Sequence, residues 1–373
     1  MEVLLVNNQW RLGGAETVIH QLLSRIPNSR LLVAESYSPN VEVMYPRLLS
    51  RLSHTRLHSM VENWFPMFEW TNRWFFRLSA DSADIIHLHN FHGFYASIEA
   101  LGALTRAKRV VWTFHGLWGA TGGCDHPKGC RRFLNACGDC PQLGLWPIGD
   151  IDRTSEQLSR KIQALADAPL RIIAPSKYVL NAIRESRVGR NWKVHHIPNG
   201  INSSRFTPRQ NFGKKLKLLV VNRNFKDPQK GFETIKDALS RINQKEFEVT
   251  LVGSNSDWAA KNLKGGIVVR NLDYLHDREA LDRLYGESEI FLFASPAENF
   301  PCVILEAMAA GCCVVATPSG GVVEQISHEE TGFLASKIYG DSLAEALSAV
   351  LSDRSKIKEV GLRARRAVIE RFK

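Results

Sequence analysis

Short apolar runs alternate with amphipathic stretches along the whole chain of 373 residues. In the first half, this pattern predicts strands at 2–7, 30–35, 84–89, 109–114, 171–174 and 193–197, and helices at 15–26, 94–106 and 177–185. In the second half, it predicts strands at 217–222, 248–252, 267–270, 289–293 and 313–316, and helices at 231–242, 278–286 and 303–310. Short runs that are apolar at every position are typical of a parallel sheet covered by helices on both faces. The chain therefore predicts an α/β fold with two doubly wound, Rossmann-like domains.

Turn and linker residues mark the expected domain boundary. The stretch 198–215 contains Pro198, Asn199-Gly200 and Pro208, followed by polar and basic residues. We therefore expect an N-terminal, acceptor-binding domain at 1–200 and a C-terminal, donor-binding domain at 201–373. Open α/β sheets bind ligands at the carboxyl ends of their strands. Two such domains that face each other predict a small-molecule site in the cleft between them.

Charge and hydropathy limit the possible surroundings of the protein. No apolar run reaches the ~18 residues needed to span a bilayer, and the first eight residues predict a strand, not a signal peptide. We therefore expect a cytoplasmic protein with reduced cysteines. Residues 1–210 hold 25 Lys and Arg against 16 Asp and Glu, which gives +9 of the net charge of +10. This excess fits either a solvated basic surface or an anionic partner such as a membrane surface, a lipid phosphate or nucleic acid.

Two glutamates near the end of a predicted strand carry the first chemical signal. Glu298 lies in the loop after the strand 289–293, and Glu306 follows it after seven residues, about one turn into the next helix. Carboxylates can accept hydrogen bonds from paired sugar hydroxyls, and a helix N-terminus attracts a diphosphate. An isolated pair of this kind is more often two ordinary acids. The next strand, however, leads into Gly320-Gly321, where the backbone can approach a phosphate closely.

The segment 298–324 resembles the donor site of glycosyltransferase family 4, whose members have the GT-B fold. Other matching pieces occur in the family's order over essentially the whole chain: Gly13-Gly14-Ala15-Glu16, Thr113-Phe114-His115-Gly116, Ala174-Pro175-Ser176, 197–202, Asn222-Arg223 and Lys230-Gly231. The resemblance implies catalytic roles for His115, Glu298, Arg223 and Lys230. It implies donor binding by Gly13, Gly14, Asn299, Phe300, Glu306, Gly320 and Gly321.

The resemblance also assigns individual roles. Arg223 and Lys230 would hold the diphosphate, Glu306 the ribose and Glu298 the transferred sugar, while His115 would lie beside the sugar and its phosphate. The family transfers a hexose with retention of anomeric configuration and without a metal, and the chain has no Asp-x-Asp motif. The chain departs from the family where Gly116 replaces the acid of the Thr-x-His-Asp stretch.

Four cysteines lie close together in a loop rich in Gly and Pro, namely Cys124, Cys130, Cys137 and Cys140. In a cytosolic protein such a cluster favours a structural zinc over disulfides, and the alternative is four reduced thiols that pack the loop. No cofactor is expected for catalysis. The loop and the Glu-Asn-Phe-Pro variant resemble a subset of family 4 that acts in colanic acid and related polysaccharide assembly. This resemblance implies work on exopolysaccharide or O-antigen.

The expected partners are a nucleotide-diphosphate sugar, a glycan acceptor on a lipid diphosphate carrier, and the inner face of the cytoplasmic membrane. The aromatic segment 60–78 would fit a membrane interface, although an aromatic face buried on the first sheet is the commoner arrangement. A nucleotide-sugar epimerase on a similar fold is a rival interpretation, but it needs an acid/base pair that the chain does not clearly supply. A nucleic-acid-binding module would leave the donor segment unexplained, so we expect no nucleic-acid partner.

Overall fold

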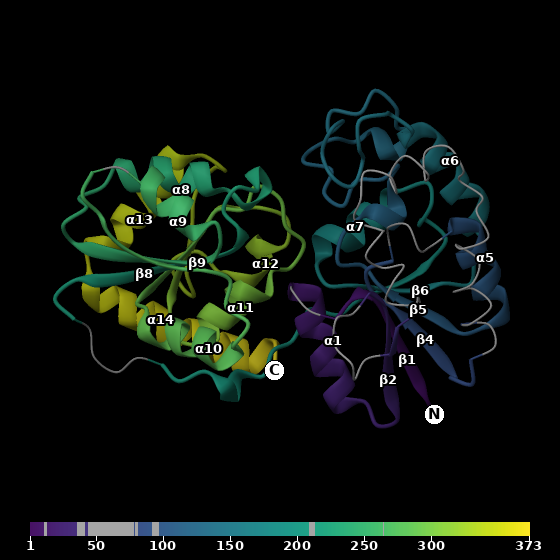
Figure 1. Cartoon of the computed structure of the whole chain (residues 1–373), viewed down its shortest axis with the longest axis horizontal. Coiled ribbons are helices and arrows are strands. Elements are labelled where there is room, and N and C mark those ends of the chain that lie inside the picture. Colours follow the sequence, from purple (N-terminus) through teal and green to yellow (C-terminus); the bar gives the residue numbers. More distant parts are fainter. Residues whose placement is uncertain are drawn as a thin grey trace. The chain divides into compact units, whose positions relative to one another are not determined.

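The computed structural model describes residues 1–10, 13–35, 42–43, 78, 81–91, 97–208, 213–263 and 265–373. These residues form two compact units, Met1–Ile197 and Pro198–Lys373, each built around one parallel sheet with helices on both sides (Figure 1). The boundary between the units falls at the start of the predicted linker.

The first unit holds a seven-stranded sheet in the order β3-β2-β1-β4-β5-β6-β7. Its strands are β1 (Val3–Gln9), β2 (Ser29–Glu35), β3 (Glu42–Val43), β4 (Ile85–Leu88), β5 (Val110–Thr113), β6 (Arg171–Ala174) and β7 (Lys193–His196). Its helices are α1 (Gly14–Arg25), α5 (Ile98–Ala107), α6 (Thr154–Leu165) and α7 (Lys177–Glu185), with short 3₁₀ turns at Trp118–Ala120 and Arg132–Leu134. The strand order reverses between β1 and β4, and such a switch point is where doubly wound sheets bind ligands.

The second unit holds a six-stranded parallel sheet in the order β10-β9-β8-β11-β12-β13. Its strands are β8 (Leu216–Asn224), β9 (Phe247–Ser254), β10 (Val268–Leu272), β11 (Ile290–Phe293), β12 (Cys313–Ala316) and β13 (Phe333–Leu334). Its helices are α8 (Phe232–Ser240), α9 (Ser256–Asn262), α10 (Arg278–Glu287), α11 (Cys302–Ala309), α12 (Val322–Gln325), α13 (Gly340–Leu351) and α14 (Arg354–Arg371), with 3₁₀ turns η3 (Ser203–Arg205) and η4 (Pro228–Lys230). Here the order reverses between β8 and β11.

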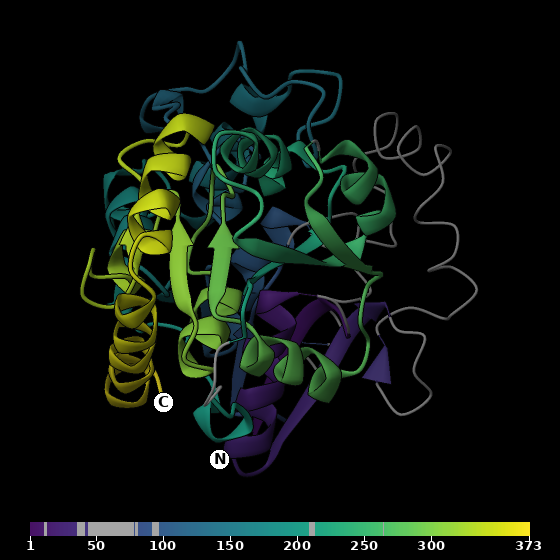
Figure 2. The ribbon, with the colours of Figure 1, turned by 90° about the vertical axis from the view of Figure 1, so that its left-hand side faces the viewer.

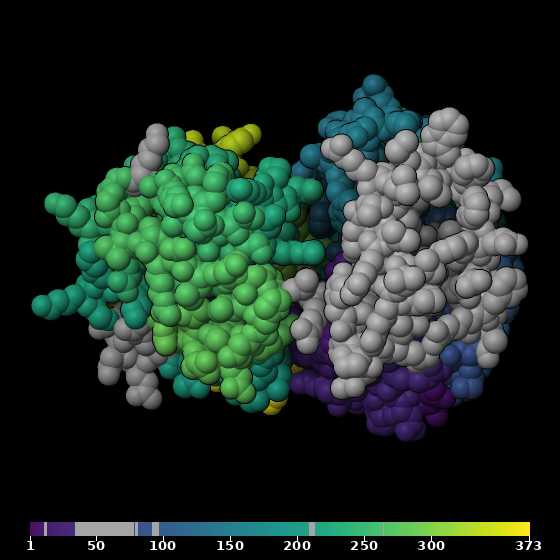
Figure 3. Space-filling model, in the orientation of Figure 1, coloured from purple at the N-terminus to yellow at the C-terminus, as the bar shows by residue number. Residues whose placement is uncertain are grey.

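Alternate residues of the second sheet enter two different cores. Leu218 and Leu292 join the core beneath α8 and α13, whereas the neighbouring Leu219 and Phe291 join the core beneath α10 and α11. Because both faces are buried at the centre of the sheet, β11 and β12 are apolar at every position, which is the pattern seen in the sequence. Each such side chain contributes roughly 1.5–3 kcal/mol when it is fully buried. Figure 2 shows this sheet between its helices, and in the space-filling view side chains close over it (Figure 3).

Polar caps fix the starts of several helices. Ser97 accepts a hydrogen bond from Ala100 N at α5, and Ser176 accepts one from Val179 N at α7. Asp277 and Asp353 cap α10 and α14 in the same way. These caps satisfy backbone N–H groups that have no partner within the helix.

Candidate functional site

Most of the predicted donor-site residues follow neighbouring strands of the second sheet. Arg223 lies near the carboxyl end of β8, Glu298 in the loop after β11, and Gly320-Gly321 in the loop after β12. The three strands are adjacent in the order β8-β11-β12. Since carboxyl ends of parallel strands meet at one edge of a sheet, the fold gathers these residues at the edge where ligands bind.

Lys230 and Glu298 form the central contact of this edge. Lys230 Nζ lies 2.9 Å from Glu298 Oε1, and the Ser295 hydroxyl lies 2.8 Å from the same oxygen. The charge of Glu298 raises the pKa of Lys230, against the effect of burial, so the amine stays cationic. The exposed fractions of the two side chains are 32% and 15%, which leaves the pair shielded but reachable by a ligand.

Local backbone geometry places Lys230 at this point. Asp227 caps η4 by accepting a hydrogen bond from Gln229 N, and Gly231 follows with φ at 70°. A Cβ atom on Gly231 would lie 2.0 Å from the carbonyl oxygen of Ala294, just after β11. Only glycine allows this approach, and the approach holds Lys230 beside the loop that carries Glu298.

Arg223 adds a second cation to the same edge. Its side chain is exposed, and its charge partly opposes the rise in the pKa of Lys230, so the two cations lie within electrostatic range of each other. The amide of Asn222 donates to the carbonyl oxygen of Lys230 at 3.4 Å. Arg223 and Lys230 thus bring two cations to this edge, and the carboxylates whose charges act on Lys230 are those of Glu298 and Asp227.

Glu306 has a different set of neighbours. Its side chain is 8% exposed, and the hydroxyl of Tyr285 on α10 donates to its Oε2 at 3.1 Å. Burial raises the pKa of Glu306, while the charge of Arg278 and the bond from Tyr285 oppose the rise. Glu306 is therefore bonded to a residue of α10. It takes no part in the ion pair between Lys230 and Glu298.

Asn299 and Phe300 are both buried, at 5% and 4% exposure. The ring of Phe300 packs edge-to-face against Phe372 at a centroid distance of 5.6 Å, and its carbonyl oxygen accepts a hydrogen bond from the Asn199 amide at 3.0 Å. The side chain of Phe300 thus belongs to the core of the second unit. Any contact of Phe300 with a ligand has to come from its backbone.

The Gly320-Gly321 loop is tied to the Glu298 loop. The hydroxyl of Thr317 lies 3.3 Å from the carbonyl oxygen of Ser295. Gly320 has φ at 52°, and Gly321 is the N-cap of α12. The hydroxyl of Ser319, the residue before Gly320, is buried and has no hydrogen-bond partner among the described residues.

In the first unit, Gly13 and Gly14 form the start of α1, after β1. A Cβ atom on Gly13 would lie 2.6 Å from Glu16 Oε2, so the turn leaves no room for a side chain unless Glu16 moves. Glu16 is buried, and its Oε1 accepts a hydrogen bond from Asn7 of β1 at 3.0 Å. This polar pair lies beside the switch point and was not predicted from the sequence.

His115 belongs to a group of three histidines, two of which the sequence reasoning missed. His89 Nδ1 lies 2.9 Å from His115 Nε2, and His87 Nε2 lies 2.8 Å from the Thr113 hydroxyl. Burial lowers the pKa of His115 to about 3 and that of His87 to about 4, and it lowers the pKa of His89 as well. The missed signal was the alternation His87-Leu88-His89, which sends both rings to one face of β4.

An acid does lie beside Gly116, the residue after His115, although it comes from elsewhere in the sequence. A Cβ atom on Gly116 would be 2.8 Å from Asp125 Oδ1, and Leu117 N donates to the carbonyl oxygen of Asp125 at 2.8 Å. Asp125 comes from the cysteine-rich loop. The carboxylate therefore occupies the space into which a side chain at position 116 would project.

The cysteines of this loop are reduced and partly buried. Among the described residues, which include Cys124, Cys130, Cys137 and Cys140, no group of three or more His, Cys, Asp or Glu side chains is placed to hold a metal ion. The zinc site stays a prediction. Beneath the loop, the buried amine of Lys161 donates to the carbonyl oxygens of Trp118 at 2.6 Å and Thr121 at 3.0 Å.

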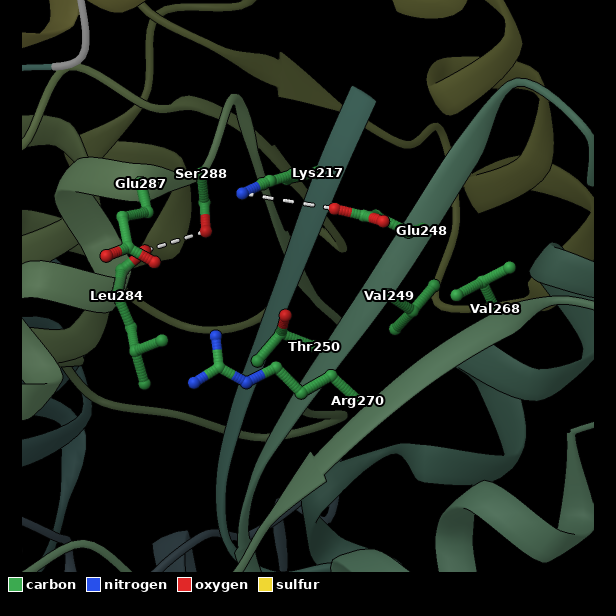
Figure 4. Close-up of a pocket in the computed structure, with 9 residues that line it drawn as sticks. All are labelled: Lys217, Glu248, Val249, Thr250, Val268, Arg270, Leu284, Glu287 and Ser288. Atoms are coloured by element: carbon green, nitrogen blue, oxygen red, sulfur yellow. Dashed lines mark hydrogen bonds and ion pairs between the residues drawn. The ribbon is translucent and has the colours of Figure 1, made fainter. Parts of the chain in front are cut away.

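A separate pocket opens at the other end of the second sheet (Figure 4). It is lined by Lys217, Glu248, Val249, Thr250, Val268, Arg270, Leu284, Glu287 and Ser288. Lys217, Glu248 and Val268 lie at the amino ends of β8, β9 and β10, and none of the predicted site residues lines the pocket. The pocket is therefore not the donor site.

Membrane contact rests on a segment that the structure does not cover. The aromatic stretch 60–78 lies outside the described residues apart from Leu78. Within the described residues, no helix combines the length and apolar character needed to cross a bilayer.

Both units match known protein families. Residues 12–205 match the family model "Glycosyltransferase Family 4", and residues 215–353 match the model "Glycosyl transferases group 1". WcaC of Escherichia coli (strain K12), named as a colanic acid biosynthesis glycosyl transferase, is 25% identical over 296 residues, 70% of each chain. Several other curated relatives match over about half of their own length.

Two solved structures share the fold. The sucrose-phosphate synthase of Thermosynechococcus elongatus superposes with a TM-score of 0.72 at 18% identity, covering 100% of this chain and 95% of its own. HepE of Anabaena, solved in complex with UDP-glucose, superposes with a TM-score of 0.66 at 17% identity and the same coverage. These matches confirm the α/β, GT-B fold that the sequence predicted.

Proposed function

The chain belongs to glycosyltransferase family 4, and we propose that it moves a monosaccharide from a nucleotide-diphosphate sugar to a glycan acceptor, with retention of anomeric configuration and without a metal ion. The observation that carries the proposal is the ion pair between Lys230 and Glu298, 2.9 Å long, at the ligand-binding edge of the second sheet. Arg223 lies within electrostatic range of the pair.

The pair of Lys230 and Glu298 suits a nucleotide-diphosphate sugar, which has an anionic diphosphate next to an uncharged sugar. An ammonium group has three N–H donors, and Glu298 engages one of them, so two can turn to the diphosphate. Arg223 can follow the same anion with its planar guanidinium. Glu298 supplies carboxylate oxygens for the hydroxyls of the transferred sugar. One edge of the sheet can thus hold both the leaving group and the sugar.

These cations also suit the chemical step. As the bond from the sugar to the diphosphate breaks, negative charge grows on the leaving phosphate. Fixed cations that are already in place stabilise that charge without reorganisation. The acceptor hydroxyl would attack from the face that the diphosphate leaves, and the leaving phosphate oxygen would take its proton. The protein then acts mainly by positioning and by electrostatics.

The acceptor is inferred from the comparisons and the charge of the chain. WcaC is named for colanic acid biosynthesis, so we place this enzyme in surface polysaccharide assembly. The excess of +9 in residues 1–210 suits an acceptor on a lipid diphosphate at the inner face of the cytoplasmic membrane. The proposed donor is supported by the UDP-glucose that HepE binds.

A thermal-shift screen against nucleotide sugars with uridine, guanosine, adenosine and thymidine bases tests the proposal. A true donor at 100 times its Kd adds about 2.7 kcal/mol to the stability of the folded state. No shift with any nucleotide or nucleotide sugar would refute donor binding. Product analysis by NMR then reports the anomeric configuration, and a free, epimerised sugar nucleotide would favour the epimerase instead.

Lys230→Ala tests the site itself, and Lys226→Ala is its control. Lys226 lies four residues away, is exposed, and has an aromatic contact at 5.9 Å from the ring centre of Trp258. A lost hydrogen bond to a charged group costs about 1.5–3 kcal/mol, so Lys230→Ala should weaken donor binding about tenfold or more, and Lys226→Ala should not. Equal binding by both variants would contradict the assignment of Lys230.

A further inference from the structure

Three histidine rings form a stack at the carboxyl ends of β4 and β5. The ring centres of His87 and His89 are 4.4 Å apart, and those of His89 and His115 are 5.2 Å apart with an interplanar angle of 17°. His87 is 7% exposed and His89 is 1% exposed, while His115 is only partly buried. The stack therefore runs from the interior of the first unit towards a ring that a ligand can reach.

The rings are joined by a hydrogen bond whose direction matters. His89 Nδ1 and His115 Nε2 are 2.9 Å apart, so one of these nitrogens donates to the other. The second nitrogen of His89, Nε2, is buried and has no hydrogen-bond partner among the described residues. Desolvation lowers the pKa of both rings, which are therefore neutral near pH 7.

A neutral imidazole carries one proton, so only two arrangements are possible. If His115 donates from Nε2, the proton of His89 must be on Nε2, where a buried N–H would lack an acceptor. If His89 donates from Nδ1, its Nε2 is a bare acceptor, and the proton of His115 is on Nδ1. Orphaned buried N–H groups are rarer in proteins than under-satisfied acceptors, so the second arrangement is favoured.

We propose that His89 is a positioning residue that fixes the tautomer of His115, so that His115 presents an N–H at Nδ1 to an oxygen of the bound donor. The contact with the donor rests on the function proposed above. In this form His115 is a neutral hydrogen-bond donor, suited to a sugar hydroxyl or a phosphate oxygen. It is not a base, because its remaining lone pair is taken by His89.

Hydrogen bonds to both neighbouring strands position the backbone of His89. His89 N donates to the carbonyl oxygen of Val6 on β1 at 2.9 Å. The indole nitrogen of Trp112 donates to the carbonyl oxygen of His89 at 2.8 Å. These two bonds fix the backbone from which the side chain of His89 extends, and the ring of His87 packs against the ring of His89 at a centre distance of 4.4 Å.

Two-bond ¹⁵N–¹H correlation spectra of histidine-labelled protein, recorded without ligand, test the tautomer directly. The expected result is a neutral Nδ1–H form for both His89 and His115 near pH 7. A neutral Nε2–H form of His115, or a charged ring at either position, would overturn the proposal. The measurement needs no donor, so a failure of the transferase assay bears only on the proposed function.

Variants separate positioning from packing. His89→Asn keeps an amide donor near the place of Nδ1, whereas His89→Leu fills the space without a donor. We expect His115 to keep its Nδ1–H form in His89→Asn and to lose it in His89→Leu. Thr113→Val is the matched control, because it removes the bond to His87 at 2.8 Å and leaves the bond between His89 and His115 untouched. An unchanged His115 tautomer in folded His89→Leu would sink the idea.

A kinetic readout follows from the same variants. With the nucleotide sugar selected by the thermal-shift panel, His89→Leu should lower kcat/KM by roughly tenfold, about the effect of one lost hydrogen bond to a charged group. His89→Asn should recover most of this loss. Wild-type kcat/KM in His89→Leu would contradict the role of His89 in orienting His115.

Discussion

The hydroxyl of Tyr285 offers a sensitive test of how Glu306 is held. Tyr285 is fully buried, and its ring packs against Phe206 and Phe291 at centroid distances of 6.1 and 5.7 Å. Tyr285→Phe keeps this packing and removes only the bond to Glu306 Oε2, which is 3.1 Å long. The buried carboxylate then loses its donor from α10.

The expected loss of stability depends on the charge of Glu306. A buried hydrogen bond to a charged group contributes about 1.5–3 kcal/mol, and one between neutral groups about 0.5–1.5 kcal/mol. Tyr285→Phe should therefore destabilise the fold by the larger amount when Glu306 is ionised and by the smaller amount when it is protonated.

The sign of the pH dependence follows from the pKa of Glu306. Burial raises the pKa of Glu306 above the ordinary value of a glutamate, and the bond from Tyr285 opposes that rise, so the substitution raises the pKa further. A carboxyl group whose pKa is raised by folding supports the folded state below its unfolded pKa and loses that support as the pH rises through its folded pKa. The difference in stability between wild type and Tyr285→Phe should thus grow as the pH rises from about 4.5 towards 7.

Urea denaturation of four proteins measures this effect: wild type, Tyr285→Phe, Glu306→Gln and the double variant, each at several pH values. In the Glu306→Gln background, the loss of the hydroxyl should cost only the neutral amount and should not vary with pH. An equal, pH-independent cost in both backgrounds would refute an ionised Glu306 held by Tyr285. If Glu306 also holds the ribose, Tyr285→Phe should weaken donor binding at neutral pH as well.

Two further predictions concern the placement of Lys230 and the cysteine loop. Gly231→Ala should destabilise the fold by about 2 kcal/mol or more in chemical denaturation, because its Cβ would lie 2.0 Å from the Ala294 carbonyl oxygen. Gly266→Ala is the control, since Gly266 also has positive φ but no atom within 4 Å of the new Cβ, and a loss as large there would show that φ alone is responsible. If the four loop cysteines hold zinc, metal analysis should find about one equivalent per chain, and well under one would remove the site.

Elements with a clean apolar pattern could be predicted from the sequence. The strand expected at 313–316 is β12, and the helix expected at 278–286 is α10 within one residue. Helix α6 was not predicted. Its buried stripe includes Lys161 beside Leu158 and Leu165, so a charged residue interrupts the apolar spacing. The buried amine of Lys161 is stabilised by hydrogen bonds to two backbone carbonyl oxygens, and these come together only in the folded chain.

Site residues could be predicted where they fall in motifs that resemble those of family 4. The resemblance to family 4 assigned both Glu298 and Lys230 to the donor site, and the structure joins them directly. The partners of His115 and Glu306 could not be predicted in this way. His89 meets His115 only through the register of β4 against β5, and Tyr285 meets Glu306 only through the packing of α10 on α11. No spacing rule along the chain encodes either contact.

The two ligand-binding edges differ in the kind of polar group that they hold, and this difference follows from burial. On the second sheet, Lys230 keeps its charge because Glu298 lies 2.9 Å from it, so a nearby opposite charge outweighs desolvation. On the first sheet, the charges that act on His89 and His115 come from neighbouring histidine rings and lower their pKa further, so desolvation prevails and both rings lose their charge. Fixed cations can stabilise a departing diphosphate, whereas neutral N–H groups can orient a sugar without attracting bulk anions. Under the proposed function, Lys230 with its counter-ion would stabilise charge, and the neutral rings of His89 and His115 would serve positioning.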